Sequence, residues 1–211
     1  ESTEALCQAA QLIFAGNDYL ADFARHARRG GATVEVLPTV IDTDRCRPQE
    51  RSSSGSGLVV GWLGTHSTMP YLESIVPSLR RLAAEIPFQL RVVSNGVPFP
   101  ALGLEVQFQS WSEKTEEEAL REMDVGIYPL PEDEWTLGKC GFKAIQYMAA
   151  GLPVVASPVG VLREIVRDGE TGFHAQQEDE WGQRLGRLLS DSVARRRFGA
   201  AGRGWGVSRY S

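Results

Sequence analysis

The chain has 211 residues, of which 42% are hydrophobic and 23% are charged, and its formal net charge is −5. This balance is typical of a globular protein with one large domain or two small ones, and its modest acidity argues against a nucleic-acid partner, which normally needs a basic stripe. The sequence contains no run of 18 apolar residues, so we expect no membrane span.

Three cysteines, Cys7, Cys46 and Cys140, lie far apart and form no CxxC pair. An odd number of isolated cysteines indicates reduced thiols in the cytoplasm, and no cluster has the spacing of a metal site. The sequence begins at Glu1, and no signal-peptide pattern follows. We therefore expect a fragment or a trimmed form of a longer protein.

The first part of the chain alternates strand-like and helix-like patterns. Residues 12–15 predict a buried strand, 17–29 an amphipathic helix capped by Asn17, and 33–38 a second strand. A polar segment rich in serine and glycine follows at 47–57, with the composition of a flexible linker. We expect this linker to separate the first unit from a larger domain.

The same alternation continues after the linker. The patterns predict strands at 58–63, 88–94, 104–111, 125–130, 152–158 and 171–175, and helices at 68–86, 115–123, 137–151, 161–169, 178–189 and 192–200. Pro77 should kink the first of these helices or mark its late start, and Thr115 with Glu118 forms a capping-box pattern. The alternation predicts an α/β fold, a doubly wound parallel sheet that binds ligands at the carboxyl ends of its strands.

The first loop at that edge, GWLGTHST at 61–68, joins a strand to a helix. Gly61 and Gly64 would let a ligand approach the backbone, Thr65 offers a hydroxyl, and His66 is a candidate ligand contact. The loop contains no acidic residue, which leaves it open to an anion. The same glycines also fit a tight turn that only permits packing.

This loop has the spacing of neither a Walker A motif nor a GxGxxG fingerprint. The strand at 88–94 also ends without the acidic residue that binds a ribose in dinucleotide-binding units, so the sequence does not favour NAD. Asn95 and Gly96 follow that strand and form either a plain turn or a second ligand contact.

A long loop at 129–140, rich in acidic and aromatic residues, is the third candidate. Pro129 and Asp133 lie in it, and long loops in compact folds are often binding loops. The acidic run at 132–134 fits a solvated face equally well.

Lys139 and Lys143 lie in or near the first turn of the helix predicted at 137–151, with no acidic residue beside them in the sequence. The N-terminal end of a helix carries partial positive charge, so two cations there are unfavourable. Either both reach into solvent at small cost, or they and the helix start at Gly141 and Phe142 bind a phosphate group. Two acid-free helix starts at one sheet edge favour a diphosphate.

Three segments of the chain resemble a known family. The sequence KAIQYMAAGLPVVASPVGVLREIVRDGETGF at 143–173 closely resembles the donor-binding region of the retaining glycosyltransferases of family 4, which have the GT-B fold. Residues 59–83 resemble the start of the same C-terminal domain, and residues 15–48 resemble the end of the N-terminal domain. The resemblance implies a remnant of the N-terminal domain at 1–46, a linker at 47–57, a Rossmann-like donor-binding domain at 58–195, and a C-terminal helix at 196–211 that packs back on the N-terminal domain.

The resemblance also implies where the donor site departs from the family pattern. The family has two glutamates eight positions apart, of which the first contacts the donor sugar and the second the ribose. Gly138 and Gln146 occupy these positions here. Gln146 can still form hydrogen bonds to a ribose diol, whereas Gly138 has no side chain for the sugar. Either Asp133 or Lys139 replaces that contact, or the sugar selectivity differs.

The function implied is that of the donor half of a retaining glycosyltransferase, with Lys139 and Lys143 as catalytic residues that stabilise the departing nucleoside diphosphate. The donor would be a nucleotide-diphosphate sugar of UDP or GDP type, with no metal and no further cofactor. A sugar or lipid-linked acceptor would bind through the missing N-terminal domain, in a cytoplasmic protein peripheral to the inner membrane. The expected donor-binding residues are Gly61, Gly64, Thr65, His66, Asn95, Gly96, Pro129, Asp133, Gly141, Phe142 and Gln146.

Two alternatives stay open. A sugar-nucleotide epimerase of GT-B fold would take its acid and base carboxylates from the DEW segment at 133–135. A degenerate, non-catalytic binding module is suggested by Gly138, by Gln146 and by the missing half of the fold.

Overall fold

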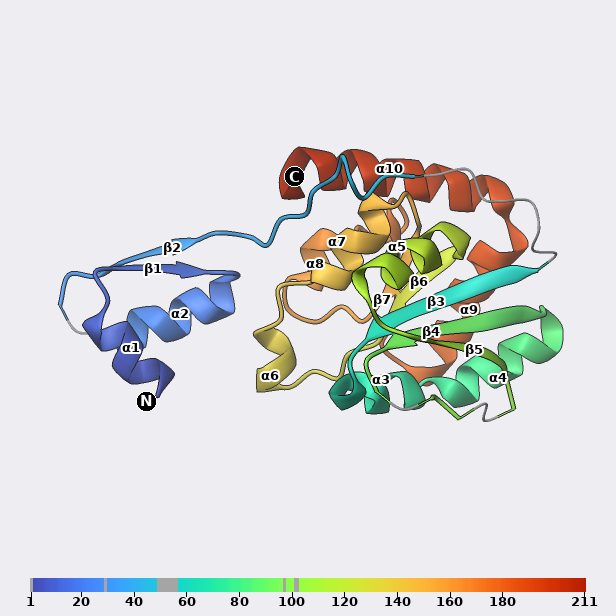
Figure 1. The fold of residues 1–211 in the computed structure, drawn as a ribbon, viewed down its shortest axis with the longest axis horizontal. Helices are drawn as coiled ribbons and strands as arrows, with labels where there is room; N and C mark the ends of the chain where they lie inside the picture. The colour runs from blue at the N-terminus through green and yellow to red at the C-terminus, as the bar shows by residue number, and fades with distance from the viewer. Residues whose placement is uncertain (1, 29, 49–56, 97, 101–102) are drawn as a thin grey trace.

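The computed structural model describes residues 2–28, 30–48, 57–96, 98–100 and 103–211, which form a small N-terminal unit and a larger C-terminal domain (Figure 1). Most of the predicted linker, residues 49–56, lies outside the described residues. Across the described ranges, no helix is long and apolar enough to cross a bilayer.

The N-terminal unit is a two-stranded parallel sheet with helices beside it. Its elements are α1 (Thr3–Ala9), β1 (Leu12–Ala15), α2 (Asp18–Ala27) and β2 (Thr33–Val36). The side chain of Asn17 accepts a hydrogen bond from the N–H of Leu20, so it caps α2 as predicted. The second strand is shorter than predicted, and α1 is not among the predicted elements.

Six parallel strands form the sheet of the C-terminal domain, in the order β5-β4-β3-β6-β7-β8. They are β3 (Leu58–Gly64), β4 (Phe88–Ser94), β5 (Glu105–Ser110), β6 (Val125–Tyr128), β7 (Val154–Ala156) and β8 (Gly172–His174). The chain winds outward from β3 in one direction and from β6 in the other, as in a Rossmann-like fold. The predicted α/β class and the predicted strands of this domain are therefore confirmed.

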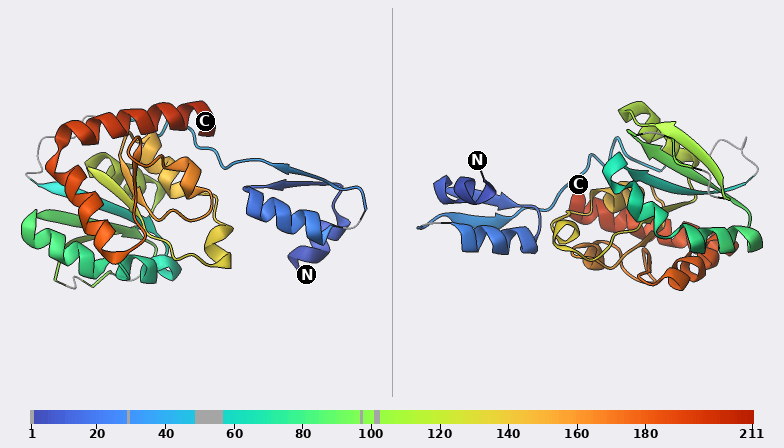
Figure 2. Two further views of the ribbon diagram at one scale, coloured as in Figure 1. Left: turned by 180° about the vertical axis from the view of Figure 1, so that it is seen from behind. Right: turned by 90° about the horizontal axis from the view of Figure 1, so that it is seen from below.

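Helices cover both faces of this sheet (Figure 2). α4 (Val76–Glu85) and α9 (Glu178–Ser190) bury leucines and Trp181 on one face, and α5 (Glu113–Glu122) and α7 (Phe142–Ala149) bury Leu120, Ile145 and Tyr147 on the other. The remaining elements are η1 (His66–Thr68), α3 (Met69–Glu73), α6 (Glu134–Leu137), α8 (Leu162–Ile165) and α10 (Ser192–Tyr210), of which α10 packs on α7.

Two helix starts differ from the prediction. The helix predicted at 68–86 is divided into η1, α3 and α4, and Pro77 lies in the first turn of α4, so the late start is the correct alternative. The predicted capping box of Thr115 with Glu118 is wrong. Ser112 caps α5 instead, because its hydroxyl accepts the N–H of Thr115 at 3.1 Å and the hydroxyl of Thr115 accepts the N–H of Ser112 at 2.7 Å.

Two helix boundaries near the predicted site also differ. The stretch at 137–151 is not one helix, because α6 ends at Leu137 and α7 begins at Phe142. Lys139 therefore lies between two helices and not in the first turn of α7. The helix predicted at 192–200 continues to Tyr210, so the predicted domain boundary after residue 195 falls inside α10.

The crossover segment, residues 41–48, packs on the C-terminal domain although most of it lies within the predicted first unit. The N–H of Ile41 donates to the carbonyl of Tyr210 at 2.8 Å. The guanidinium of Arg203 on α10 donates to the carbonyl of Cys46 at 2.6 Å. The end of α10 and the crossover segment are thus tied together.

β3 and β6 separate toward their carboxyl ends. Their pairing stops at Gly61 and Gly126, whereas the pairing of β3 with β4 continues to the end of β3. The phenol of Tyr147 on α7 enters the gap, where it accepts the N–H of Leu63 at 2.8 Å and donates to the carbonyl of Gly61 at 3.3 Å. Gly126 leaves room for it, because an added Cβ would lie 2.3 Å from the ring of Tyr147.

Replacing Tyr147 by Phe should lower the free energy of unfolding by about 1–3 kcal/mol, because the buried N–H of Leu63 loses its acceptor. Urea denaturation measures this change. Tyr19→Phe, at an exposed ring on α2, is the control and should change stability by less than about 0.5 kcal/mol. Equal stability of Tyr147→Phe and the wild type would contradict the structural role of this hydroxyl.

Candidate functional site

The carboxyl ends of β3, β4 and β6 meet at the edge of the sheet that faces the N-terminal unit (Figure 1). The strand order reverses between β3 and β6, which is where doubly wound sheets bind ligands. The loops after β3 and β4 are joined, because the N–H of His66 donates to Oδ1 of Asn95 at 3.1 Å. Gly96 lies against His66, since an added Cβ would be 2.8 Å from the Cβ of His66.

The two glycines of the first loop are explained by packing. Gly61 is buried inside β3, and an added Cβ would lie 2.0 Å from the sulfur of Met123. At Gly64 an added Cβ would lie 2.1 Å from the ring of Trp62. Thr65 is exposed, but its hydroxyl already shares hydrogen bonds with neighbouring hydroxyl groups in the loop.

The start of α7 points its N–H groups at the same edge. Gly141 precedes the helix with φ of 71°, in the left-handed region that favours glycine, and an added Cβ would lie 2.2 Å from Ile165. No side chain among the described residues caps this helix, and Phe142 beside it is exposed. The N–H groups of the first turn are therefore open to water or to an anion.

Glu116 on α5 lies beside Lys143. The ammonium of Lys143 donates to Oε2 of Glu116 at 2.8 Å, and the indole N–H of Trp111 donates to the same oxygen at 2.8 Å. The amide of Gln146 donates to Oε1 of Glu116 at 2.6 Å. The prediction that no acid lies beside the lysines thus holds for the local sequence but is wrong in space, because Glu116 comes from 27 positions earlier.

These contacts decide the ionisation of Glu116. Burial alone would raise the pKa of this carboxyl, but the hydrogen bond and the charge of Lys143, with the hydrogen bonds from Gln146 and Trp111, outweigh burial and lower its pKa. Glu116 is therefore charged at neutral pH. It fixes the ammonium of Lys143 beside the open end of α7.

Gln146 has one hydrogen-bonding atom left over. The residue is only 6% exposed, and its Oε1 is buried without a hydrogen-bond partner among the described residues. The amide cannot be reversed, because two acceptor oxygens would then face each other across the contact with Glu116. Oε1 is thus a buried acceptor without a hydrogen-bond donor among the described residues.

Lys139 is partly buried in the turn between α6 and α7. Burial lowers the pKa of its ammonium, against the opposing attraction of the Asp133 carboxylate. The ammonium lies 5.7 Å from the centre of the exposed Trp135 ring. Unlike Lys143, it forms no ion pair with an acidic side chain in the described part of the chain.

The acids of the third loop have structural partners. Asp133 caps α6, since its carboxylate accepts the N–H of Thr136 at 2.8 Å. Glu132 forms an exposed ion pair with Arg163 at 3.1 Å. Pro129 is buried directly after β6. Within the described ranges, no group of three His, Cys, Asp or Glu residues is placed to hold a metal ion.

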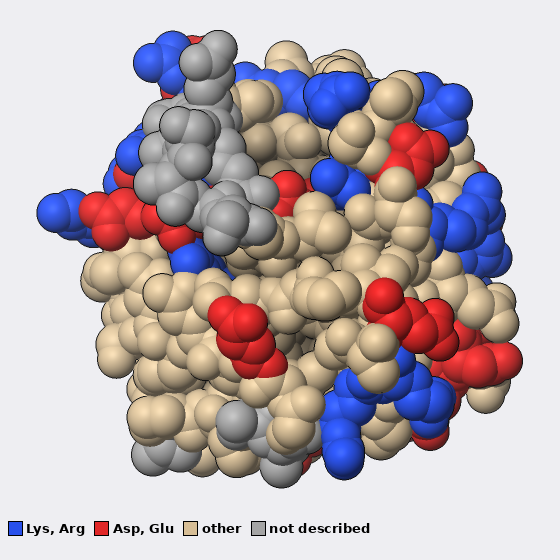
Figure 3. Space-filling view, turned by 90° about the vertical axis from the view of Figure 1, so that its right-hand side faces the viewer, with Lys and Arg blue, Asp and Glu red and all other residues tan. Residues whose placement is uncertain are grey.

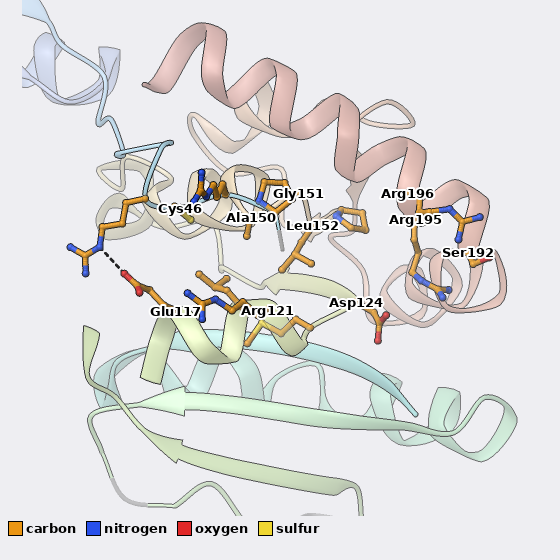
Figure 4. A pocket seen from close by; sticks show the side chains of 16 residues that line it. Cys46, Glu117, Arg121, Asp124, Ala150, Gly151, Leu152, Ser192, Arg195 and Arg196 are labelled. Atoms are coloured by element: carbon orange, nitrogen blue, oxygen red, sulfur yellow. Dashed lines mark hydrogen bonds and ion pairs between the residues drawn. The ribbon is translucent and has the colours of Figure 1, made fainter. Parts of the chain in front are cut away.

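A hollow of about 260 Å³ opens at the opposite edge of the sheet, beside the residues that precede β6 and β7 (Figure 4). Lys and Arg side chains gather in several groups on that face (Figure 3). Among the arginines that line the hollow, Arg121 lies in the last turn of α5, where a cation interacts favourably with the helix dipole. Arg195 donates to the carbonyl of Leu188 near the end of α9. Arg121 and Arg195 thus have structural roles that need no ligand.

The sequence of the C-terminal domain matches a described family. A family model for Glycosyl transferases group 1 matches residues 57–191, which include the whole six-stranded sheet. The chain belongs to the group 1 glycosyl transferases. The resemblance predicted from the sequence is confirmed at this level, and assignment to family 4 stays a prediction.

Two curated proteins are similar to this glycosyl transferase chain. It is 27% identical to the D-inositol 3-phosphate glycosyltransferase of Nocardia farcinica over 202 residues, which cover 82% of the chain and 44% of that protein. It is 40% identical to the D-inositol 3-phosphate glycosyltransferase of Corynebacterium aurimucosum over 63 residues, which cover 29% of the chain and 15% of that protein. The chain thus spans less than half the length of the curated relatives it matches.

Solved structures share the fold of this glycosyl transferase chain. Sucrose-phosphate synthase from Thermosynechococcus elongatus is 20% identical with a TM-score of 0.75, over 99% of the chain and 56% of that protein. Anabaena Alr3699/HepE, solved in complex with UDP and glucose, is 15% identical with a TM-score of 0.77, over 100% of the chain and 64% of that protein. These similarities agree with the predicted Rossmann-like half of a GT-B fold.

Glu116 and Trp111 are absent from the predicted site residues of this glycosyl transferase chain. Glu116 stands in an acidic run whose members look alike in the sequence. The helical period offers one signal, because Ala119 and Leu120 lie three and four positions after Glu116 and are both buried. Glu116 therefore belongs to the buried face of α5, unlike its acidic neighbours.

Replacing Glu116 by Gln should lower the free energy of unfolding at pH 7 by about 1–3 kcal/mol. The pKa of Glu116 is lower in the folded chain than its ordinary value of 4.5, so its contribution is present above that value and is lost as the pH falls through the folded pKa. Urea denaturation of both proteins between pH 7 and pH 3 should show the difference shrinking in acid.

Glu118→Gln is the matched control, because Glu118 lies on the same helix and, among the described residues, forms an ion pair only with the exposed Lys114 at 3.8 Å. Its effect should stay below about 0.5 kcal/mol across the same range. A difference between Glu116→Gln and the wild type that does not depend on pH would contradict the ionisation of Glu116 described above.

Proposed function

We propose that this chain is the donor-binding part of a retaining glycosyltransferase that uses a nucleotide-diphosphate sugar of UDP or GDP type. The observation that supports this most directly is the open N-terminal end of α7, with Lys143 held in its first turn at the crevice between β3 and β6. A helix N-terminus with a fixed cation suits a phosphate group.

Different residues bind different parts of the donor. Lys143 donates one of its three N–H groups to the carboxylate of Glu116, which leaves two N–H groups for the oxygens of a diphosphate. The N–H groups after Gly141 bind the same diphosphate, whereas Oε1 of Gln146 is buried and does not reach a ribose hydroxyl in this arrangement. When the glycosidic bond to the diphosphate breaks, Lys143 and Lys139 stabilise the charge that develops on the leaving oxygen.

The relatives agree with this donor class. Anabaena Alr3699/HepE was solved with UDP and glucose and also with UDP-glucose. The curated relatives are glycosyltransferases of more than twice the length of the matched region. We propose that the acceptor, a sugar or a lipid-linked sugar, binds between this domain and the rest of a longer protein, which is cytoplasmic and peripheral to the inner membrane.

The two alternatives have less support. An epimerase would need acid and base carboxylates near the donor sugar, but Asp133 uses its carboxylate to cap α6. A degenerate module would need no fixed cation, whereas three donors, including Lys143, are organised around Glu116. The loss of a side chain at Gly138 then points to altered sugar contacts and not to a lost donor site.

Calorimetric titration with UDP and GDP tests the proposal. Lys143→Ala should weaken binding of the preferred nucleotide about tenfold or more, because a charge-assisted contact to the diphosphate is removed. Lys143→Gln keeps a donor for Glu116 and should lose a similar factor. Lys114→Ala on the exposed face of α5 is the control and should bind like the wild type.

Two results would contradict the proposal. One is that the wild-type chain binds neither nucleoside diphosphate at millimolar concentration. The other is that Lys143→Ala binds as well as the control variant.

A further inference from the structure

Asn17 lies where the N-terminal unit meets the C-terminal domain. It follows β1, precedes α2, and is only 2% exposed. A buried amide requires hydrogen-bond partners for both its oxygen and its nitrogen. The two halves of this side chain find their partners in different parts of the molecule.

The oxygen of Asn17 serves its own unit, because Oδ1 accepts the N–H of Leu20 at 2.8 Å and caps α2. The nitrogen serves the other domain, because Nδ2 donates to the carbonyls of Leu137 and Lys139, each at 3.1 Å. The amide orientation is fixed by these partners, since reversal would place an oxygen against two carbonyls.

The two carbonyls belong to the turn that contains Lys139. Leu137 is the last residue of α6, a helix of 4 residues, and the last carbonyls of a helix lack partners within it. Asn17 thus supplies, from the N-terminal unit, two donors to the turn between α6 and α7. A hollow of about 230 Å³ beside this turn is lined by both parts of the chain, including Asn17 and Leu137.

The preceding residue brings the backbones close together. An added Cβ at Gly16 would lie 2.3 Å from the sulfur of Cys140. The free thiol of Cys140 thus packs directly on the backbone of the N-terminal unit. The hydrogen bonds of Asn17 and this contact together dock the unit on residues 137–140.

We propose that Asn17 is a positioning residue that couples the docking of the N-terminal unit to the conformation of the Lys139 turn. The amide of Asn17 holds the turn only when the unit is docked, so the placement of Lys139 depends on the position of that unit. The consequence for donor binding rests on the proposed function, whereas the coupling itself does not.

Asn17→Asp separates the two halves of the amide. Aspartate keeps an oxygen to cap α2, but it has no N–H for the carbonyls of Leu137 and Lys139. In the ligand-free chain, amide hydrogen exchange across residues 137–143 should become about tenfold faster. Exchange across α2 should stay as in the wild type, which a general loss of stability would not permit.

A second substitution, at the neighbouring Asp18, compensates for the negative charge that Asn17→Asp adds. Asp18 is the exposed first residue of α2, so the double variant Asn17→Asp with Asp18→Asn keeps the net charge. It should exchange as fast at 137–143 as Asn17→Asp alone, and Asp18→Asn alone should match the wild type. Unchanged exchange at 137–143 in both variants that carry Asn17→Asp would overturn the proposal.

Nucleotide binding provides the second readout. Asn17→Asp should weaken UDP or GDP binding several-fold if Lys139 contacts the diphosphate. If the wild type binds no nucleotide, the proposed function fails, yet the exchange experiment still decides whether the coupling exists. Unchanged nucleotide affinity combined with faster exchange would overturn the inference that the conformation of the Lys139 turn affects donor binding.

A double-mutant cycle at Gly16 and Cys140 tests the contact between the two parts of the chain without a substitution of Asn17. Gly16→Ala should accelerate exchange at 137–143, because its new Cβ meets the sulfur of Cys140. Cys140→Ala removes that sulfur, so the double variant should return toward the exchange rate of Cys140→Ala alone. Purely additive effects of the two substitutions would show that the parts do not touch here.

Discussion

The separation of β3 from β6 determines where the rest of the site can form. Parallel pairing between them ends at Gly61 and Gly126, and the phenol of Tyr147 supplies the hydrogen bonds that the missing pairing would have made. Tyr147 belongs to α7, so the same side chain that fills the gap fixes the helix over it. The contact of Tyr147 with the strands therefore helps to place the open N-terminal end of α7 at the crevice, in addition to the loop that precedes the helix.

The two lysines at this crevice are held in different ways. Lys143 is neutralised in part by Glu116, which three neighbouring donors keep ionised, so its position is set by a rigid charged network. Lys139 has a backbone position set by the N-terminal unit and an ammonium whose pKa is lowered by burial. One cation is thus fixed within the domain, and the other depends on contact between the two parts of the chain.

The sequence was sufficient to predict the α/β class, the parallel sheet and the family, because strands and glycine-rich turns are local patterns. It was insufficient for Glu116, whose partner is 27 positions away, and for the donor half of Asn17, whose partners are 120 and 122 positions away. The placement of Lys139 inside one helix failed for a related reason. α7 begins after Gly141, whose backbone is left-handed, and the close approach of Ile165 to this glycine is a distant contact that the local sequence does not report.

The hydrogen bonds between α10 and the crossover segment limit how the N-terminal unit is connected to the C-terminal domain. The N–H of Ile41 donates to the carbonyl of Tyr210, and the N–H of Leu37 donates to the carbonyl of Ala15 in the N-terminal unit. The segment between these two hydrogen bonds, residues 38–40, is therefore short. Pro38 lies within it, and its ring fixes one of the few remaining torsions. A reorientation of the N-terminal unit on the C-terminal domain would therefore have to change the backbone torsions of residues 38–40. Asn17 and Pro38 line the same hollow, so the contacts of Asn17 with the Lys139 turn lie close to this hinge.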